Sequence, residues 1–445
     1  MSQLKSISPV DGRYYKKTKV LRQYFSESAL IKYRIHVEIE YFIALCELPL
    51  KQLRKFPKNK IKIIREIYKE FSHEDALKVK EIENTTNHDV KAVEYYIKEK
   101  FDKHNLSEFK EFIHFGLTSQ DINNTAVPMS IHDAYNNIIL KELEKICSLL
   151  KKLSKKWDNV PMIARTHGQA ASPTRMGKEI NVFIERLENQ IKLIPTIKFM
   201  GKFGGATGNF NAHHIAYPNH NWKKFADKLL KNSLNLERQQ TTTQIEHYDN
   251  IAALMNNLER INNILIDLCR DMWTYISMDY FKQKIKKNEV GSSAMPHKVN
   301  PIDFENAEGN LAISNSLFKF LSNKLPISRL QRDLTDSTVS RNIGVPFAHQ
   351  LISFSSIIKG LEKIIINKKK IEKDLENNWA VCAEAIQTIL RREHYPNPYE
   401  KLKELTRTRS KIDKEIINEF INKLEVSETI KDELRNINPS TYTGI

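Results

Sequence analysis

The sequence predicts an all-α protein built around a bundle of long helices. Two observations lead to this fold class: apolar residues recur at helical spacing through three long segments, and patterns typical of strands are scarce. A chain of 445 residues is also too long for a single hydrophobic core, so we expect more than one domain. Hydrophobic residues make up 40% of the chain and charged residues 28%, as in ordinary globular proteins.

The three periodic segments span residues 135–157, 176–194 and 251–275, with apolar side chains at steps of three and four. Each is longer than the average globular helix of about 11–12 residues. Wide apolar stripes on long helices need partners, so these helices are expected to form a bundle, completed in part by other subunits. We expect an N-terminal helical domain at 1–108, a central long-helix domain at 109–362 and a C-terminal helical domain at 363–445, which opens with a charged run.

Composition excludes several classes of protein. No run of about 18 apolar residues predicts a membrane span, and the first ten residues, "MSQLKSISPV", have no apolar stretch typical of a secretory signal. The four cysteines are Cys46, Cys147, Cys269 and Cys382, and their wide spacing predicts neither a zinc site nor a disulfide framework and fits a reducing cytoplasm. The net charge of +16 comes from lysines that are spread along the chain, and no nucleic-acid-binding motif accompanies them. Nucleic-acid binding is therefore not favoured. A basic surface would still raise the local concentration of an anionic substrate.

Side chains suited to acid–base chemistry lie where the helical pattern breaks. In "RTHGQ", His167 lies between two of the long segments, where an imidazole is accessible and can exchange a proton near neutral pH. A histidine that only bonds loop backbone is equally compatible with this motif. In "NTTNHDVKAVEYYI", Thr85, Thr86 and Asn87 are expected to cap a helix that begins near Asp89, which explains Asp89 better than it explains His88.

Two further breaks predict anion binding. Thr118 and Ser119 in "HFGLTSQD" precede a helix, where free N–H groups and hydroxyls bind phosphate or carboxylate, although plain helix caps look the same. The stretch "RLQRDLTDSTVSRN" puts arginines beside hydroxyls, a combination that favours bidentate binding of phosphate or carboxylate, although a solvated charged face has the same composition. Its candidate residues are Arg329, Arg332, Ser337, Thr338 and Arg341.

The most concentrated chemistry is in "VGSSAMPHKVNP" at 290–301. Gly291 permits unusual backbone angles, and Pro296 and Pro301 exclude a continuous helix, so this segment is expected to be a loop that opens and closes. A polar surface loop would not need this density of functional groups. The candidates within it are Ser292, Ser293, Lys298 and Asn300.

This stretch resembles the signature loop of the fumarase/aspartase superfamily, close to G-S-S-x-M-P-x-K-x-N-P, and matches it at every fixed position. The His297–Lys298 pair resembles the adenylosuccinate lyase family, as do "SPVDGRYY", "NHDVKAVEYY", "HFGLTSQD", "RTHGQ", "DLTDSTVSRN" and "RREHYPNPYEKLKELTR", in that order along nearly the whole chain. The resemblance is to the longer bacterial branch. Two positions depart from the pattern: Ala170 replaces a usual proline, and Tyr248 replaces a usual histidine, which affects one auxiliary contact.

The resemblance implies a carbon–nitrogen lyase of purine biosynthesis, which eliminates fumarate from adenylosuccinate to give AMP and acts likewise on the succinylcarboxamide ribotide of aminoimidazole. It implies a homotetramer with active sites shared between subunits and neither a metal nor an organic cofactor. Ser292 would be the base and His167 the acid, with Lys298 stabilising negative charge, His88 assisting and Glu305 orienting a histidine. The substrate-binding residues that it implies are Arg13, Tyr14, Asn87, Asp89, Thr118, Ser119, Gln169, Gln244, Ser293, Asn300, Asn306, Arg332, Ser337, Thr338 and Arg341.

Three alternatives to this function remain at this point. An argininosuccinate lyase of the same superfamily would act on a substrate without phosphate. A non-enzymatic structural protein on the same scaffold would release no fumarate, although intact His167, Ser292 and Lys298 argue against it. An RNA-binding protein would have an RNA affinity that falls steeply with salt.

Overall fold

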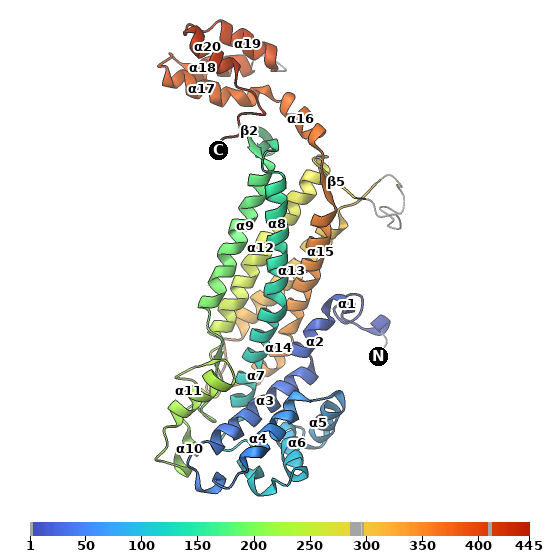
Figure 1. Ribbon diagram of the computed structural model, residues 1–445, viewed down its shortest axis with the longest axis vertical. Helices are drawn as coiled ribbons and strands as arrows, with labels where there is room; N and C mark the ends of the chain where they lie inside the picture. The colour runs from blue at the N-terminus through green and yellow to red at the C-terminus, as the bar shows by residue number, and fades with distance from the viewer. Residues whose placement is uncertain (1–2, 285–294, 296–297, 408–411) are drawn as a thin grey trace. The chain divides into compact units, whose positions relative to one another are not determined.

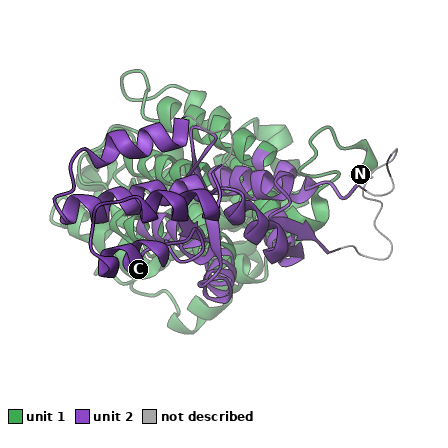
Figure 2. Cartoon of the chain, turned by 90° about the horizontal axis from the view of Figure 1, so that it is seen from above, with its two compact units in different colours: residues 1–144, 190–263, 309–355 green, residues 145–189, 264–308, 356–445 purple. Residues whose placement is uncertain are grey.

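The computed structural model describes residues 3–284, 295, 298–407 and 412–445, and they form two compact units, coloured separately in Figure 2. The first unit comprises residues 1–144, 190–263 and 309–355, and the second comprises residues 145–189, 264–308 and 356–445. The prediction of an all-α fold is confirmed, because nearly all of the elements in Figure 1 are helices. These two units do not test the boundaries of the three expected domains, which stay a prediction.

Five long helices begin in one unit and end in the other: α8 (Leu140–Lys156), α9 (Met176–Leu193), α12 (Asp249–Ser277), α13 (Ile302–Lys324) and α15 (Gly344–Lys363). The three helices expected from apolar periodicity correspond to α8, α9 and α12. The first of them is preceded by a π-helical turn at Tyr135–Ile139 that joins α7 (Ser119–Ala134) to α8.

The first unit holds a continuous hydrophobic core that runs from Ile31 to Leu236 in sequence. Helix α3 lies at its centre, because residues 37–43 are buried on every side of the helix. Its elements are α1 (Tyr15–Thr18), α2 (Arg22–Phe25), α3 (Glu27–Cys46), α4 (Ile61–Lys69), α5 (His73–Thr86), α6 (Asp89–Lys103), α7, α10 (Asn211–Ala216), α11 (Trp222–Ser233), α14 (Thr335–Ser340), β3 (Met200–Gly201) and β4 (Glu237–Arg238).

A cluster of buried polar side chains links three long helices within the first unit. Asn262 of α12 donates to the Ser314 hydroxyl of α13 at 3.1 Å and accepts from Gln350 of α15 at 2.7 Å. All three side chains are 0% exposed. Because buried amides need their partners, this cluster favours a single alignment of the three helices.

The second unit contains the C-terminal helices, which surround a smaller core around Trp379, Ile386 and Leu434. Its elements are β1 (Pro161–Thr166), β2 (Gln169–Arg175), β5 (Phe281–Gln283), β6 (Ile364–Ile366), α16 (Lys368–Glu376), α17 (Ala383–Arg392), α18 (Pro398–Arg407), α19 (Lys414–Asn422) and α20 (Glu428–Arg435). Across the described residues the strands pair two by two, antiparallel in β1–β2 and β5–β6 and parallel in β3–β4. No helix among the described residues is both long enough and apolar enough to cross a membrane.

Candidate active site

His167 lies at the tip of a β-hairpin in the second unit. Strands β1 and β2 pair antiparallel, with Thr166 opposite Gln169, so His167 and Gly168 form a two-residue turn. Their φ values are +53° and +78°, the left-handed pair that matches the twist of a hairpin. Both His167 and Gln169 are exposed at this tip. The sequence predicted an accessible loop here, and the structure adds the strands that hold it.

The signature loop is described only in part. Ser292 and Ser293 lie outside the described residues. Lys298 is exposed, and its N–H donates to the carbonyl oxygen of Met295 at 3.0 Å. Asn300 is half-buried just before α13 begins.

Glu305 and Asn306 follow on the first turns of α13. The Glu305 carboxylate accepts a hydrogen bond from the indole N–H of Trp273 at 3.0 Å, and Asn306 accepts one from the Ser356 hydroxyl at 3.0 Å. All of these residues belong to the second unit. The role of Glu305 in orienting a histidine stays a prediction.

In the first unit, the "NTTNHDV" motif lies between α5 and α6, and the residues expected to cap α6 do not do so. Thr85 and Thr86 end α5 and do not cap the next helix, because Asn87 adopts a left-handed conformation with φ +51° and its N–H closes α5 on the Glu83 carbonyl. His88 is the N-cap of α6, since its Nδ1 accepts from the Lys91 N–H at 3.1 Å. A capping role therefore accounts for His88, whose side chain is 51% exposed.

Asp89 is held between two arginines. Its Oδ2 lies 2.7 Å from Nη2 of Arg34 on α3 and 3.0 Å from Nη2 of Arg341 after α14. Burial would raise the pKa of Asp89, but the two guanidinium groups and the N–H of Val90 lower it to about 2. The carboxylate is therefore ionised at neutral pH and fixes both arginines.

Helix α14 brings further candidates to the same place. Arg332 donates to the Ser337 hydroxyl at 2.8 Å, and Arg341 donates to the Ser337 carbonyl at 3.1 Å. The buried Asp336 carboxylate accepts from the Ser337 N–H at 2.7 Å. Thr338, on the same short helix, is exposed. The structure thus gathers Asp89, Ser337 and Arg341, together with Arg332.

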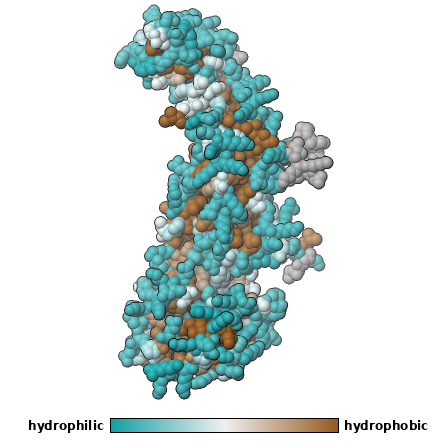
Figure 3. Space-filling model, viewed as in Figure 1, coloured by the Kyte–Doolittle hydropathy of each residue, from teal (hydrophilic) through white to brown (hydrophobic). Residues whose placement is uncertain are grey.

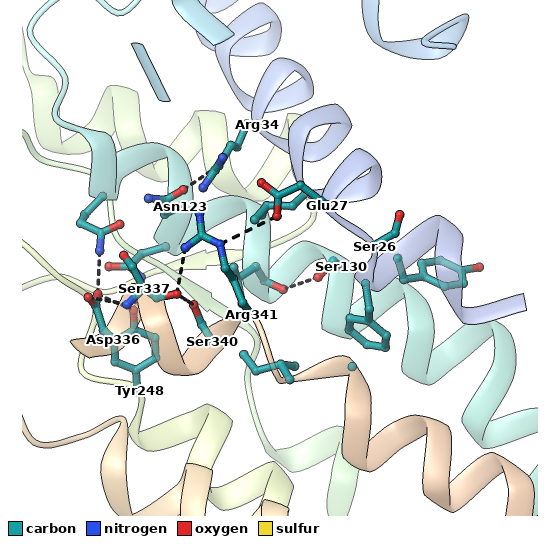
Figure 4. Close-up of a pocket in the computed structure, with 18 residues that line it drawn as sticks. Ser26, Glu27, Arg34, Asn123, Ser130, Tyr248, Asp336, Ser337, Ser340 and Arg341 are labelled. Atoms are coloured by element: carbon teal, nitrogen blue, oxygen red, sulfur yellow. Dashed lines mark hydrogen bonds and ion pairs between the residues drawn. The ribbon is translucent and has the colours of Figure 1, made fainter. Parts of the chain in front are cut away.

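Ser337 and Arg341 line an open pocket in the first unit, drawn in Figure 4, whereas Asp89 and Arg332 contact them from outside the lining. Arg341 lies beside Glu27, with Nε 3.8 Å from its carboxylate, and Asn123 and Arg34 lie close by. The sequence analysis noted Tyr248 as a departure from the family pattern and missed the following lining residues: Ser26, Glu27, Arg34, Asn123, Ser130, Asp336 and Ser340. One signal existed for Arg34, because a charge between Ile31 and Ile35 lies on the apolar face of its helix.

Tyr248, the departure from the family pattern, is buried at this pocket. Its hydroxyl accepts from Asn124 at 2.5 Å and donates to Asp336 at 3.1 Å. Gln120 donates to the same Asp336 oxygen at 2.6 Å. The tyrosine therefore supports Asp336, which in turn holds the backbone of Ser337.

Thr118 and Ser119 begin α7, as predicted, and a buried ion pair fixes this end of the helix. The Asp121 carboxylate accepts from the Thr118 N–H at 2.8 Å and from the Lys202 ammonium group at 2.8 Å, and both charged side chains are 0% exposed. The N–H groups of Gly204 and Gly205 complete its contacts. The motif "HFGLTSQD" is thereby tied to "GKFGG".

The remaining substrate-binding candidates are not part of the pocket lining. Gln244 is half-buried in the loop before α12, and Arg13 is exposed before α1, with its guanidinium 6.0 Å from the Tyr14 ring centre. His88, Thr118 and Ser119 do not line this pocket either. His167, Gln169, Lys298, Asn300, Glu305 and Asn306 belong to the other unit, so the two groups are described separately.

Known proteins match the chain over its whole length. A family model described as "Lyase" matches residues 12–313, and one described as "Adenylosuccinate lyase C-terminal" matches residues 328–443. The chain is 56% identical to an adenylosuccinate lyase from Dictyostelium discoideum, with 100% of this chain and 97% of the relative covered. It is 44% identical to the adenylosuccinate lyase of Escherichia coli strain K12, with the same coverage.

A solved structure of the 3-carboxy-cis,cis-muconate lactonizing enzyme from Pseudomonas putida has a TM-score of 0.75 at 17% identity, covering 96% of this chain and 94% of that one. At that identity the likeness supports the fold alone.

Proposed function

The chain belongs to the adenylosuccinate lyase family, and we propose that it eliminates fumarate from adenylosuccinate to give AMP, and from the succinylcarboxamide ribotide of aminoimidazole in the same way. The observation that carries this choice within the superfamily is the arginine- and serine-rich pocket of the first unit. Arg341 and Ser337, with Arg332 beside them, offer the donors that a phosphate monoester needs. Argininosuccinate, the alternative substrate, carries no phosphate.

The elimination requires two proton transfers. A proton must leave a carbon next to a carboxylate, and the departing nitrogen must gain one. We assign the second step to His167, whose place at a two-residue hairpin turn leaves the imidazole exposed and accessible to substrate. His88 would assist near the leaving group.

Ser292 is proposed as the base. A serine hydroxyl is a weak base unless its alkoxide is stabilised, and Lys298 can supply that positive charge once closure excludes water. Lys298 would also stabilise the carboxylate that gains charge as the carbanion forms. Ser293 and Asn300 would bind substrate from the same loop.

The other contacts follow from the family pattern. Thr118, Ser119 and Gln244 would hold the succinyl part of the substrate, and Arg13 and Tyr14 would join Arg341 at the nucleotide. Asn87, Asp89, Gln169, Asn306 and Thr338 are proposed as further ligands. No step in this mechanism calls for a metal or an organic cofactor.

We propose a homotetramer whose active sites combine residues of different subunits. Exposed apolar side chains support this assembly, because a patch of them can mark a contact face. Ile313 and Phe320 lie seven residues apart on α13 and are 48% and 52% exposed. In the segment after this helix, Ile327, Leu330 and Leu334 are 67%, 98% and 69% exposed. Hydrophobic residues also gather on the visible surface of the long helices in Figure 3.

The proposed location is the cytoplasm. The four widely spaced thiols, three of them buried, are typical of proteins in a reducing compartment.

A direct assay tests the activity. The protein is mixed with adenylosuccinate and the ultraviolet absorbance of AMP formation is followed, with argininosuccinate as the comparison substrate. Turnover of adenylosuccinate alone is expected. Turnover of argininosuccinate alone would move the protein to the neighbouring family, and no fumarate from either would indicate a structural protein.

A mixing experiment tests the shared site. Ser292→Ala and His167→Ala are each expected to be inactive, and exchange of subunits between them should restore up to about a quarter of the activity, because each needed residue is intact in half of the chains. Confirmed exchange without recovery would show that both residues act from one chain. Sedimentation of a fully active 51.9 kDa monomer would overturn the tetramer.

A further inference from the structure

Arg34 is a buried charge that the proposed mechanism does not use. It lies on the core-facing side of α3 and is only 2% exposed. A guanidinium group keeps its charge under all ordinary conditions, so burying it is costly unless its donors find acceptors. The contacts of this one side chain therefore need a full account.

Two of its three nitrogens are paired. Nε donates to the Asn123 side-chain oxygen at 2.8 Å, and Nη2 donates to Asp89 at 2.7 Å. The third nitrogen, Nη1, is buried without any hydrogen-bond partner. A buried donor left unsatisfied costs about 1–3 kcal/mol, and more when the donor is charged. Such a group in a native protein calls for a specific explanation.

Its surroundings supply one, because Arg34 lines the open pocket of the first unit. Figure 4 shows its guanidinium beside Asn123 and near Arg341, with Ser337 and Ser340 on the further side of Arg341. Hydroxyl groups and a second guanidinium around an open space make a suitable place for an oxyanion.

The charges around the pocket offset one another. Arg34 and Arg341 share one carboxylate, Asp89. Glu27, 3.8 Å from Arg341, and the buried Asp336 are further carboxylates in the pocket lining. The case for an oxyanion therefore rests on the donor that Nη1 offers and not on net charge.

We propose that Arg34 is a substrate-binding residue whose Nη1 donates to a phosphate oxygen in this pocket. Its Nε and Nη2 hold the guanidinium plane and position Asp89, so the free nitrogen is fixed before the ligand arrives. Phosphate is favoured over carboxylate because two serines and a second arginine line the same space. That this phosphate belongs to AMP or adenylosuccinate rests on the proposed function.

Arg34→Lys is the main test. Lysine keeps the positive charge and can reach Asp89, but it cannot also donate to Asn123 and to a ligand. The dissociation constant of AMP, measured by calorimetry, should rise about ten- to hundredfold, as expected for the loss of one charged hydrogen bond. The constant for fumarate should change less than about twofold, and KM for adenylosuccinate should rise while kcat changes by less than about threefold.

Arg65→Lys is the matched control. Arg65 forms a two-point ion pair with Glu40 in the same unit at 2.8 Å, but it does not line the pocket. This variant should bind AMP as the wild type does. Arg34→Ala provides a second measurement, because millimolar guanidinium, well below denaturing concentration, should partly restore its AMP affinity while equal sodium chloride should not.

Several outcomes would overturn the proposal. Unchanged AMP affinity in a folded Arg34→Lys protein would leave Nη1 with a structural role only. Weakened fumarate binding with intact AMP binding would place Nη1 at the succinyl end. If Arg34→Ala does not fold, the AMP affinity of Arg34→Lys still tests the proposal.

Failure of the proposed function can be told apart from failure of this inference. A wild-type protein that neither cleaves adenylosuccinate nor binds AMP contradicts the proposed function. The phosphate site itself is then tested by thermal unfolding with and without inorganic phosphate. Phosphate should stabilise the wild type and Arg65→Lys but not Arg34→Lys. Equal protection of all three would refute the site.

Discussion

Replacing Lys202 by methionine tests whether the buried ion pair holds the start of α7. The Lys202 ammonium group contacts Asp121 at 2.8 Å and also the Gly205 carbonyl, with no exposure to solvent. Burial lowers the pKa of Lys202, and the nearby carboxylate opposes that shift. Methionine fills nearly the same volume but leaves a buried carboxylate without its cation.

The expected cost follows from the contacts that remain. Removing one partner of a buried pair costs about 3–5 kcal/mol. Asp121 keeps the N–H groups of Thr118, Gly204 and Gly205, so we expect the lower end, about 3 kcal/mol. Replacing Asp121 by leucine as well should not recover this loss, because the three N–H groups would then be the unsatisfied ones.

The assay is urea unfolding followed by circular dichroism, with the shift of the first transition taken as the readout. Lys198→Met is the control, since Lys198 pairs with Glu237 at 2.7 Å on the surface and should cost less than about 1 kcal/mol. Because Thr118 begins the helix, KM should rise in the Lys202 variant. A loss below about 1 kcal/mol, equal to the control, would refute the reasoning.

Three further changes have defined outcomes. His167→Ala should lower kcat by about 10²- to 10⁴-fold with little change in substrate affinity, and a fall of less than about threefold would mean that the acid lies elsewhere. Glu27→Gln should tighten AMP binding up to about fivefold in calorimetry, because it removes the carboxylate that competes for Arg341, and weaker binding would contradict that role. Burial lowers the pKa of His114, but the Glu38 carboxylate 2.5 Å away raises it overall, so this pair stabilises the fold fully below about pH 6.5 and less as pH rises through the raised pKa. Stability measured by urea from pH 6 to 9 should therefore fall more steeply in the wild type than in His114→Asn, where asparagine tolerates the φ of +58°, and parallel profiles would exclude the pair as the cause.

The long helices could be predicted because their signal is local. Apolar residues at steps of three and four mark α8, α9 and α12 over many turns, and no competing pattern interrupts them. The hairpin around His167 was missed for the opposite reason. Its strands are short, and a His-Gly turn lacks the usual Asn-Gly signal, so only the backbone angles reveal it.

The boundary between α5 and α6 shows a second limit. Three good capping residues stand in a row, and sequence preference alone does not decide which helix each one serves. The left-handed Asn87 settles it by ending α5, which moves the cap of α6 to His88.

Only some residues of the candidate pocket stood out in the sequence, and their contacts did not. Asp89 and Arg341 each stood out by motif, whereas their meeting with Arg34 joins three segments far apart in sequence. Such convergence depends on tertiary packing, which periodicity does not encode. Arg34 lies in no recognisable motif, and its position between Ile31 and Ile35 was the one sign of its burial.

The buried cluster of Asn262, Ser314 and Gln350 has a consequence for folding fidelity. Stripes of isoleucine and leucine are nearly equivalent from one turn to the next, so long helices can meet in alignments shifted by about 5.4 Å. A shift of one turn between α12 and α15 would break the hydrogen bond from Gln350 to Asn262 and leave a buried donor and a buried acceptor without each other. The native alignment is therefore favoured over alignments in which the apolar contacts alone would be similar.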